Sequence, residues 1–396
     1  MTVGQKVRGV LPWLPAYVWQ RMSRRAAVHG PVHLIVGLAD HFEPSFLPAM
    51  PHGVWAPREE QGRRLERWCD EYPKMADDWR DSDGRPFRHT YFFPAEQYDG
   101  ALIARLADHC RAGWGEIEIH LHHGVGAPDT SDSTRWRLVQ FRDALAGLGC
   151  LSRIDGAGQP RYAFVHGNWA LANSNQGRFC GVDDEMGILA DTGCYADLTL
   201  PSAPSPAQIS KINALYECSL PLDERAPHRC GRDLTSGRAP TTFPLIIQGP
   251  LMLDFGRRVR RWPVPRIENS EITTARPPTM ERLRHWRRAG ITVQGRPNWV
   301  FIKLHCHGMD LRHQEAILGA PMRNFLREVA GEAKNGYRDK VHFVTAREMV
   351  NIALAACDGR EGNPGDYRDY RLKLIGSEPK SEADGTLRLR AVGRTV

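Results

Sequence analysis

The sequence contains no long hydrophobic run and no secretory signal. A membrane-spanning helix needs about 20 consecutive apolar residues, and no stretch of the chain reaches even about 18. The N-terminus also lacks the order of a basic, an apolar and a small-residue region that marks a secretory leader. We therefore expect a cytoplasmic protein without a membrane span, while peripheral contact with a membrane stays open.

Signatures of disulfides and of zinc knuckles are missing too. The nine cysteines are an odd number and include no CxxC pair. This distribution argues against a disulfide framework and against a structural zinc knuckle, and it favours reduced thiols. No internal repeat is visible.

The charge balance is basic, but nothing else in the sequence indicates nucleic-acid binding. The net charge of +7 comes largely from arginine, as in residues 257–261 (RRVRR). An excess of this kind can attract nucleic acid. However, no basic helix with interleaved aromatic residues and no known nucleic-acid motif accompanies it. We expect no specific nucleic-acid partner; a solvated basic face, or attraction to an acidic glycan or a lipid-phosphate carrier, explains the charge equally well.

The chain is long enough to bury a full core. It has 396 residues, of which 41% are hydrophobic. We expect an N-terminal extension over residues 1–30, a catalytic domain over 31–360 with a variable insertion at about 210–278, and a C-terminal tail over 361–396. Beyond about residue 376 the tail is polar and contains Gly, Pro and Ser, so part of it should be disordered.

Strand-like and helical segments alternate along the domain. Apolar and β-branched runs predict strands at residues 32–38, 88–94, 115–122, 162–169, 193–201, 242–253, 299–304 and 341–344. Helical spacing of apolar residues predicts helices at 59–79, 101–112, 131–148, 279–289, 315–332 and 346–357, and a short helix or turn at 184–190. Pro73 should kink or interrupt the first of these helices. The alternation is typical of parallel βαβ units and hence of an α/β fold.

The most informative stretch is residues 115–124 (GEIEIHLHHG), where an alternating strand ends in three histidines within four positions. Ile117, Ile119 and Leu121 fall on one face of such a strand, and Glu118, His120 and His122 fall on the other, with His123 just past it. A single histidine on a strand is usually structural. Three together at a strand end favour a divalent-metal or proton-transfer site over a polar rim with one hydrogen-bonded histidine.

Two other predicted strands end in similar residues. Asp40 and His41 follow the run LIVGLA, and His305 and His307 end the run WVFIKL. Catalytic groups at the ends of several strands are typical of the C-terminal face of an α/β barrel. These three strand ends therefore predict one tightly bound divalent ion per chain.

These motifs, in this order, resemble polysaccharide deacetylases of carbohydrate esterase family four. Residues 90–94 (TYFFP) followed by 115–120 (GEIEIH) are similar to that family's Thr-Phe-Phe and Glu-Ile-Gly-x-His strands; Asp40-His41 stands where the family has an Asp-Asp pair, and Leu304-His305 where it has a late Leu-His. Residues 343–345 with Glu348 resemble its closing strand and helix. The resemblance covers roughly residues 32–357, loosely between 210 and 278. It implies an irregular (β/α)7 barrel with insertions and a metal-dependent deacetylase that uses Zn²⁺ or a similar ion.

The resemblance also implies roles for individual residues, with two alternatives left open. Either Asp40 is the catalytic base and His41 a metal ligand, or Asp40 is the ligand and Glu43 or another group is the base. His120 is the constant ligand; because Gly124 stands at the family's second histidine position, either His122 or His123 must substitute. His305 matches the family's acid histidine. The remaining residues are substrate-binding candidates near the site: Asn168, Trp169, Tyr195, Asp197 and His307.

Three functions compete on this basis. The leading one is a metal-dependent hydrolase that removes the acetyl group of an N-acetylated sugar during polysaccharide or glycolipid biosynthesis, with the carbohydrate as its partner. A related barrel hydrolase could instead cleave a glycosidic bond or another amide, and paired carboxylates about 5–9 Å apart would favour glycosidase chemistry. The third is a catalytically inert glycan-binding barrel. Neither the sugar, the metal nor the oligomeric state follows from the sequence.

Overall fold

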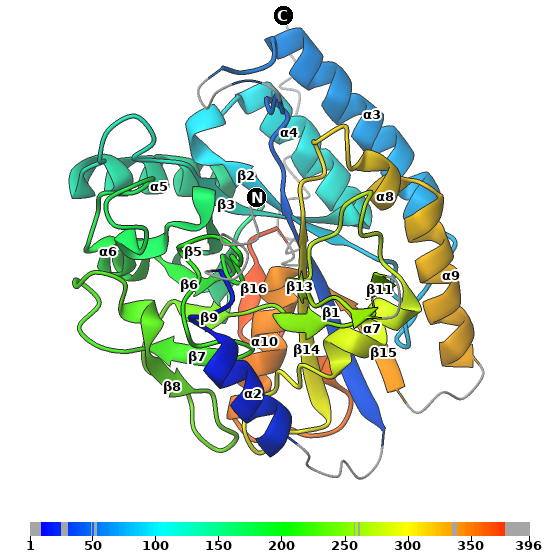
Figure 1. Cartoon of the computed structure of the whole chain (residues 1–396). Coiled ribbons are helices and arrows are strands. Elements are labelled where there is room, and N and C mark those ends of the chain that lie inside the picture. Colours follow the sequence, from blue (N-terminus) through cyan, green and yellow to red (C-terminus); the bar gives the residue numbers. More distant parts are fainter. Residues whose placement is uncertain are drawn as a thin grey trace, which may run out of the picture.

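The computed structural model describes residues 9–24, 31–48, 50, 54–256, 258–259, 262–334 and 339–376. They form a mixed α/β fold around a large, mostly parallel sheet of twelve strands (Figure 1). The main path of the sheet has the strand order β14-β1-β2-β3-β5-β6-β9-β7-β8, and β15 pairs with the first half of β1. The expected α/β class is confirmed at this level.

Strands and helices alternate through the first half of the chain as expected. The strands are β1 (Val32–His41), β2 (His89–Pro94), β3 (Gly115–Leu121), β5 (Ala157–His166) and β6 (Cys194–Asp197). The helices between them are α3 (Arg58–Ala76), α4 (Gly100–His109), α5 (Ser131–Gly147) and α6 (Glu185–Thr192). Pro73 does not end helix α3, which continues to Ala76. Proline lacks one backbone N–H donor, and because Pro73 lies in the last turn, the missing hydrogen bond does not interrupt the body of the helix.

The second half differs from the prediction in two elements. The helix expected over 315–332 is two helices, α8 (Gln314–Leu318) and α9 (Ala320–Lys334), separated by Gly319 in an extended conformation. The strand expected over 242–253 is two short strands, β9 (Leu245–Ile247) and β10 (Met252–Asp254). The remaining elements of this half include β7 (Leu215–Cys218), β8 (Gly231–Asp233), β13 (Arg266–Glu268), α7 (Met280–Arg287), β14 (Trp299–Cys306), β15 (Asp339–Val344) and α10 (Ala346–Cys357).

The sheet has open ends in the described part of the chain. Strands β7 and β8 extend one end with antiparallel pairs, and no ladder joins β14 to that end. Along its free edge, β14 instead meets an irregular segment, since Ile272 N–H donates to His305 O at 2.9 Å. The sheet is therefore compatible with a barrel-like domain, but the described strands do not form a closed ring.

The two faces of the sheet pack against different elements. Side chains alternate along each strand, so one set points to each face. Leu34, Tyr91 and Ile117 belong to an outer core that includes Leu65 and Trp68 of α3. Ile35, Phe92, Val165 and Phe301 belong to an inner core that includes the apolar side chains of α10. Because both faces are covered, every residue of β1, β2, β3 and β14 is buried.

Helix α10 fills the inner face of the sheet near the amino-terminal ends of the strands. All twelve of its residues are buried. Every residue after Asn351 is apolar, as expected for a helix end enclosed in a core, and the three polar side chains, Arg347, Glu348 and Asn351, have ion-pair or hydrogen-bond partners. Its first turn is fixed by a capping box, in which Thr345 accepts from the Glu348 backbone and Glu348 from the Thr345 backbone. Polar side chains lie on the same face at the carboxyl ends of the strands, where α10 does not cover the sheet.

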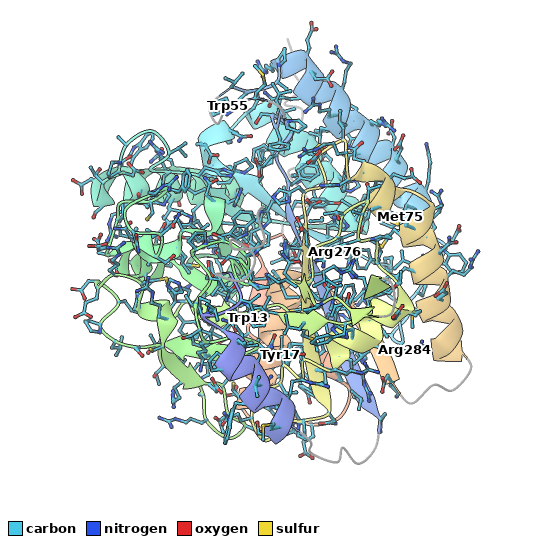
Figure 2. All side chains as sticks on the ribbon, viewed as in Figure 1. Trp13, Tyr17, Trp55, Met75, Arg276 and Arg284 are labelled. Carbon is cyan, nitrogen blue, oxygen red and sulfur yellow. The ribbon has the colours of Figure 1, made fainter. Side chains whose placement is uncertain are left out.

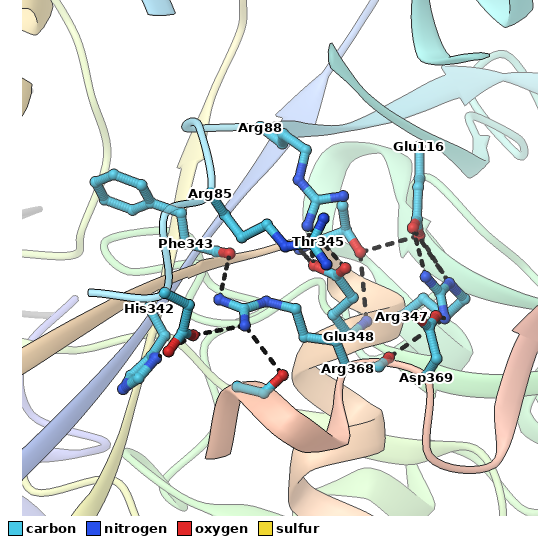
Figure 3. Close-up of polar contacts among 12 residues, drawn as sticks. Arg85, Arg88, Glu116, His342, Phe343, Thr345, Arg347, Glu348, Arg368 and Asp369 are labelled. Carbon is cyan, nitrogen blue, oxygen red and sulfur yellow. Dashed lines mark hydrogen bonds and ion pairs between the residues drawn. The ribbon is translucent and has the colours of Figure 1, made fainter. Parts of the chain in front are cut away.

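Buried ion pairs hold the start of α10 against β2 and β3 (Figure 3). Arg347 Nη2 lies 2.7 Å from Glu116 Oε1, and Arg88 Nη2 lies 2.6 Å from Glu348 Oε2. Nearby, Arg368 pairs with Asp81 and Asp83. Since these groups are almost fully buried, each charge depends on its partner for stability.

The ends of the chain contribute packing of their own. Helix α2 (Leu14–Ser23) follows Trp13, which is buried with Tyr17 in the inner core (both labelled in Figure 2). At the other end, β16 (Leu372–Leu374) pairs with β4 (Ser152–Ile154). The part of the expected tail beyond residue 376 lies outside the described residues. Among the described helices, none has the length and apolar character needed to cross a bilayer.

Candidate metal centre

Six polar side chains meet on the inner face, where three strands end. We call them the strand-end cluster. One histidine of each pair lies in a strand, and its companion lies just past the strand end: His41 and Glu43 at β1, His120 and His122 at β3, and His305 and His307 at β14. The centre of the His41 ring lies 5.0 Å from the ring centre of His120, 4.7 Å from that of His307 and 6.2 Å from that of His305. Neighbouring parallel strands place these residues side by side, so the sequence-predicted convergence of the three strand ends is present.

His120 has the environment of a metal ligand. Its Nδ1–H donates to Val165 O at 2.8 Å, which leaves Nε2 as the unprotonated ring nitrogen. Nε2 is buried, has no hydrogen-bond partner within the described residues, and lies 3.6 Å from Glu43 Oε1. A buried lone pair without a donor is costly unless a cation or proton meets it, so this atom fits a divalent ion.

Glu43 is the central carboxylate of the cluster. It forms one compact set of donor atoms with His120 and His122, and a second with His41 and His307. Burial alone would raise the pKa of Glu43, but His122 and His120 together lower it to about 2, so the carboxylate is ionised. An ionised carboxylate among imidazoles is a donor set that divalent metals such as zinc accept.

His122 completes the first of these sets. Its Nδ1 lies 2.8 Å from Glu96 Oε1, just past the end of β2, and its Nε2 lies 3.9 Å from Glu43 Oε1. Burial lowers the pKa of His122, yet Glu43 and Glu96 outweigh it and raise the pKa to about 9. A carboxylate on Nδ1 orients a ligating imidazole and increases its basicity, which gives Glu96 a positioning role.

A cavity of about 660 Å³ adjoins the cluster at His305. Its walls are mostly apolar and include Trp169, Glu271 and the proline-rich segment 201–206. The Nδ1 of His305 is buried with no hydrogen-bond partner among the residues described. Burial, together with the charges of Lys303 and His307, holds the pKa of His305 well below its usual value, so the ring is neutral at rest.

Asp40 points away from the strand-end cluster, to the outer face of the sheet. Its carboxylate accepts a hydrogen bond from Gly308 N–H at 2.6 Å and lies 3.0 Å from His89 Nδ1. Adjacent residues of a strand face opposite sides, so Asp40 and His41 cannot both reach the inner face. Asp40, His89 and Cys306 form a separate buried group of metal-ligating side chains.

The other predicted site residues lie in three different surroundings. Trp169 lines the cavity, and Asn168 precedes it with a buried Nδ2 that lacks a hydrogen-bond partner within the described chain. Tyr195 is buried and its hydroxyl donates a hydrogen bond to Glu118. Asp197 is also buried and accepts a hydrogen bond from the Thr199 hydroxyl. Neither Tyr195 nor Asp197 is among the residues that line the cavity.

His123 is separated from His120 and His122. The alternation of side chains continues past the end of β3 at Leu121, so His122 stays with His120 while the His123 ring points to the other side, into a second buried group with His166, Cys180 and Glu185. The sequence prediction did not include five of the residues found here: His166, Glu96, Cys180, Glu185 and Glu271. Two of them carried a usable signal, because Glu96 lies two positions after a predicted strand and His166 lies near the end of another.

No protein-family model matches the chain, and no curated protein matches it either. The case for a function therefore depends on the geometry of the site.

Proposed function

We propose that the chain is a metal-dependent hydrolase with its active site at the strand-end cluster, on a sheet that forms an irregular barrel of the (β/α)7 type. The observation that supports this most strongly is the buried Nε2 of His120, which faces Glu43 and has no hydrogen-bond partner in the described part of the chain. His120, His122 and Glu43 would hold the ion, and zinc suits two imidazoles and a carboxylate. The ion would polarise a carbonyl oxygen and acidify water.

His305 is the proton carrier in this proposal. A neutral imidazole at the cavity wall accepts the proton of the attacking water and then donates it to the leaving amine as the carbon–nitrogen bond breaks. Acceptance comes first because the ring is neutral at rest. His305 therefore acts as an acid only after it has acted as a base.

An amide of an N-acetylated sugar is the substrate class that fits the cavity best. The indole of Trp169 offers an apolar platform for a sugar ring, and the largely apolar wall suits an acetyl methyl group. Glycosidase chemistry needs two available carboxylates. Glu271 on the cavity wall is one. A second is lacking in this proposal, since Glu43 would hold the ion and Asp40 accepts from Gly308 and faces His89 on the other side of the sheet.

The test is acetate release from N-acetylated amino-sugar oligomers by the purified protein. We expect His305→Ala to lower turnover by roughly 10²–10⁴-fold while the bound metal stays, and His285→Ala, a change on α7, to leave both unchanged. A His305→Ala variant that keeps its metal and its full activity would rule out the proposed mechanism. Release of a reducing sugar without acetate would instead establish a glycosidase.

A further inference from the structure

A second set of donor atoms lies where β3 and β5 end and α6 begins. His123 Nε2 lies 2.9 Å from His166 Nε2 and 2.8 Å from Glu185 Oε1, and Cys180 Sγ lies 3.7 Å from Glu185 Oε2. The four donor atoms all lie within 4.8 Å of one another. The side chains are at most 2% exposed. We call these four residues the buried ligand group.

Hydrogen bonds on the far side of each ring orient the two imidazoles of the group. His123 Nδ1 lies 3.2 Å from Asp129 Oδ2, and His166 Nδ1 donates to the carbonyl of Gly167. Both Nε2 atoms are thereby turned toward each other and toward Glu185 Oε1, at separations of 2.8–3.4 Å. A cation among these three atoms would offset their mutual repulsion.

From this arrangement we infer that His123, His166, Cys180 and Glu185 bind a structural Zn²⁺, apart from the proposed catalytic ion. Bonds of about 2.0 Å to nitrogen and oxygen and about 2.3 Å to sulfur place tetrahedral ligands roughly 3.3–3.7 Å apart. The His166–Glu185 and Cys180–Glu185 separations of 3.4 and 3.7 Å match this range. The two separations from His123 Nε2, 2.9 and 2.8 Å, would have to lengthen by about 0.4–0.5 Å to admit the ion. All four donors come from the chain and are buried, which is typical of a closed structural site rather than a catalytic one. Binding releases the Cys180 thiol proton to solvent.

Carboxylates around the group support its ligands. Asp129 orients His123, and Thr134 Oγ1 lies 3.2 Å from both Asp129 Oδ2 and His123 Nδ1. The second oxygen of Glu185 accepts from Ala172 N–H at 2.6 Å. Partners of this kind fix the orientation of metal ligands.

The site would hold together a region with little regular structure. Residues 167–184 contain only two short 3-10 turns and several residues with positive φ. They contact the loop after β3 through Asp129 N–H, which donates to Cys180 O at 2.8 Å, and Phe179 N–H, which donates to Gly124 O at 3.1 Å. The same region carries Trp169, so the zinc would stabilise one wall of the cavity.

Cobalt substitution tests this inference separately from the proposed activity. The strand-end cluster has no cysteine, so sulfur-to-cobalt charge-transfer absorption does not come from the proposed catalytic ion. We expect this absorption in the Co²⁺-loaded wild type and in His120→Ala. It should be lost in Cys180→Ser and kept in the control Cys194→Ser, which changes an equally buried thiol. Cys306 lies in a third group of donors, with Asp40 and His89, so Cys306→Ser is a second control that should keep the absorption.

Affinity gives a second measurement in case Cys180→Ser does not fold. Asp129→Asn leaves all four ligands in place, and we expect it to weaken zinc binding by roughly 10–100-fold. Wild type without the charge-transfer absorption, or Asp129→Asn with unchanged zinc affinity, would overturn the inference and indicate a proton shared by His123 and Glu185 instead. Loss of acetate release with the absorption retained would count against the proposed activity only.

Discussion

Two adjacent histidines, His122 and His123, serve different sites in this structure. The first lies between Glu43 and Glu96, and the second lies beside Glu185. Where the sequence left the choice between them open, the alternation of side chains decides it, because His122 continues the face of His120 and His123 points to the opposite side. The partners of His123 come from segments distant in the sequence, which a period-two pattern does not describe.

Gly167 links the two sites, and its substitution tests their proximity. A Cβ at this position would overlap the ring of His122. We expect Gly167→Ala to lower turnover by displacing His122, and to cost about 1–3 kcal/mol in the free energy of unfolding through overpacking. Kinetics and urea unfolding measure both effects.

Gly147→Ala is the matched control, since a Cβ there meets nothing within 4 Å and the residue lies in α5. It should keep full activity and gain about 0.5–1 kcal/mol in stability. An active Gly167→Ala protein with unchanged stability would show that the close approach to His122 does not exist in solution.

At the scale of elements, the packing of α10 against β3 depends on a buried ion pair. Glu116 of β3 pairs with Arg347, which is 2% exposed. Removing one partner leaves the other buried and unpaired, so we expect Glu116→Gln to lower the free energy of unfolding by about 3–5 kcal/mol. Asp369→Asn, which changes the exposed partner of the same arginine, should cost only about 0–1 kcal/mol. Equal losses in urea unfolding would contradict the assignment.

The free energy of unfolding should depend on pH through Asp83, which links His342 of β15 to Asn363 and Arg368 in the segment after α10. Burial acts to raise the pKa of Asp83, but hydrogen bonds from His342, Asn363 and Arg368 outweigh it and hold the pKa well below its usual value. A carboxylate with a lowered folded-state pKa adds stability above about pH 4, its ordinary value, and loses it as the pH falls further. We expect Asp83→Asn to be less stable at pH 7.

The same variant should lose less stability than the wild type on acidification below about pH 4. Urea unfolding across a pH series measures the difference between the two proteins. Parallel curves over the whole range would show that Asp83 has the same pKa in the folded and unfolded states.

The elements that were predicted well are those whose pattern is local. Periodicity alone located β1, β3, β14 and α10, because their apolar runs and alternating residues reflect the burial of each element directly. The variable part was predicted poorly, since β7 and β8 are short and paired across distant residues. Burial of α10 inside the sheet was not foreseen, because Arg347, Glu348 and Asn351 in its first half are typical of a solvent-exposed helix, whereas here they are paired within the core.

On the scale of the whole molecule, the chain offers metal ligands in groups with different surroundings. The strand-end cluster adjoins a cavity, whereas the buried ligand group is enclosed. The search for CxxC pairs missed the latter because its residues come from distant segments: His123 lies 43 positions before His166 and 62 before Glu185. Only folding brings such ligands together, so their spacing carries no local signal.

The number of metal ions per chain tests the central claim most directly. Elemental analysis of purified protein never exposed to chelator should find two ions in the wild type, and one in each of His120→Ala and Cys180→Ser. Only His120→Ala should lose acetate release while keeping its thermal stability. A His120→Ala protein that keeps both ions and full activity would contradict the account, since His120 would then be an ordinary buried histidine.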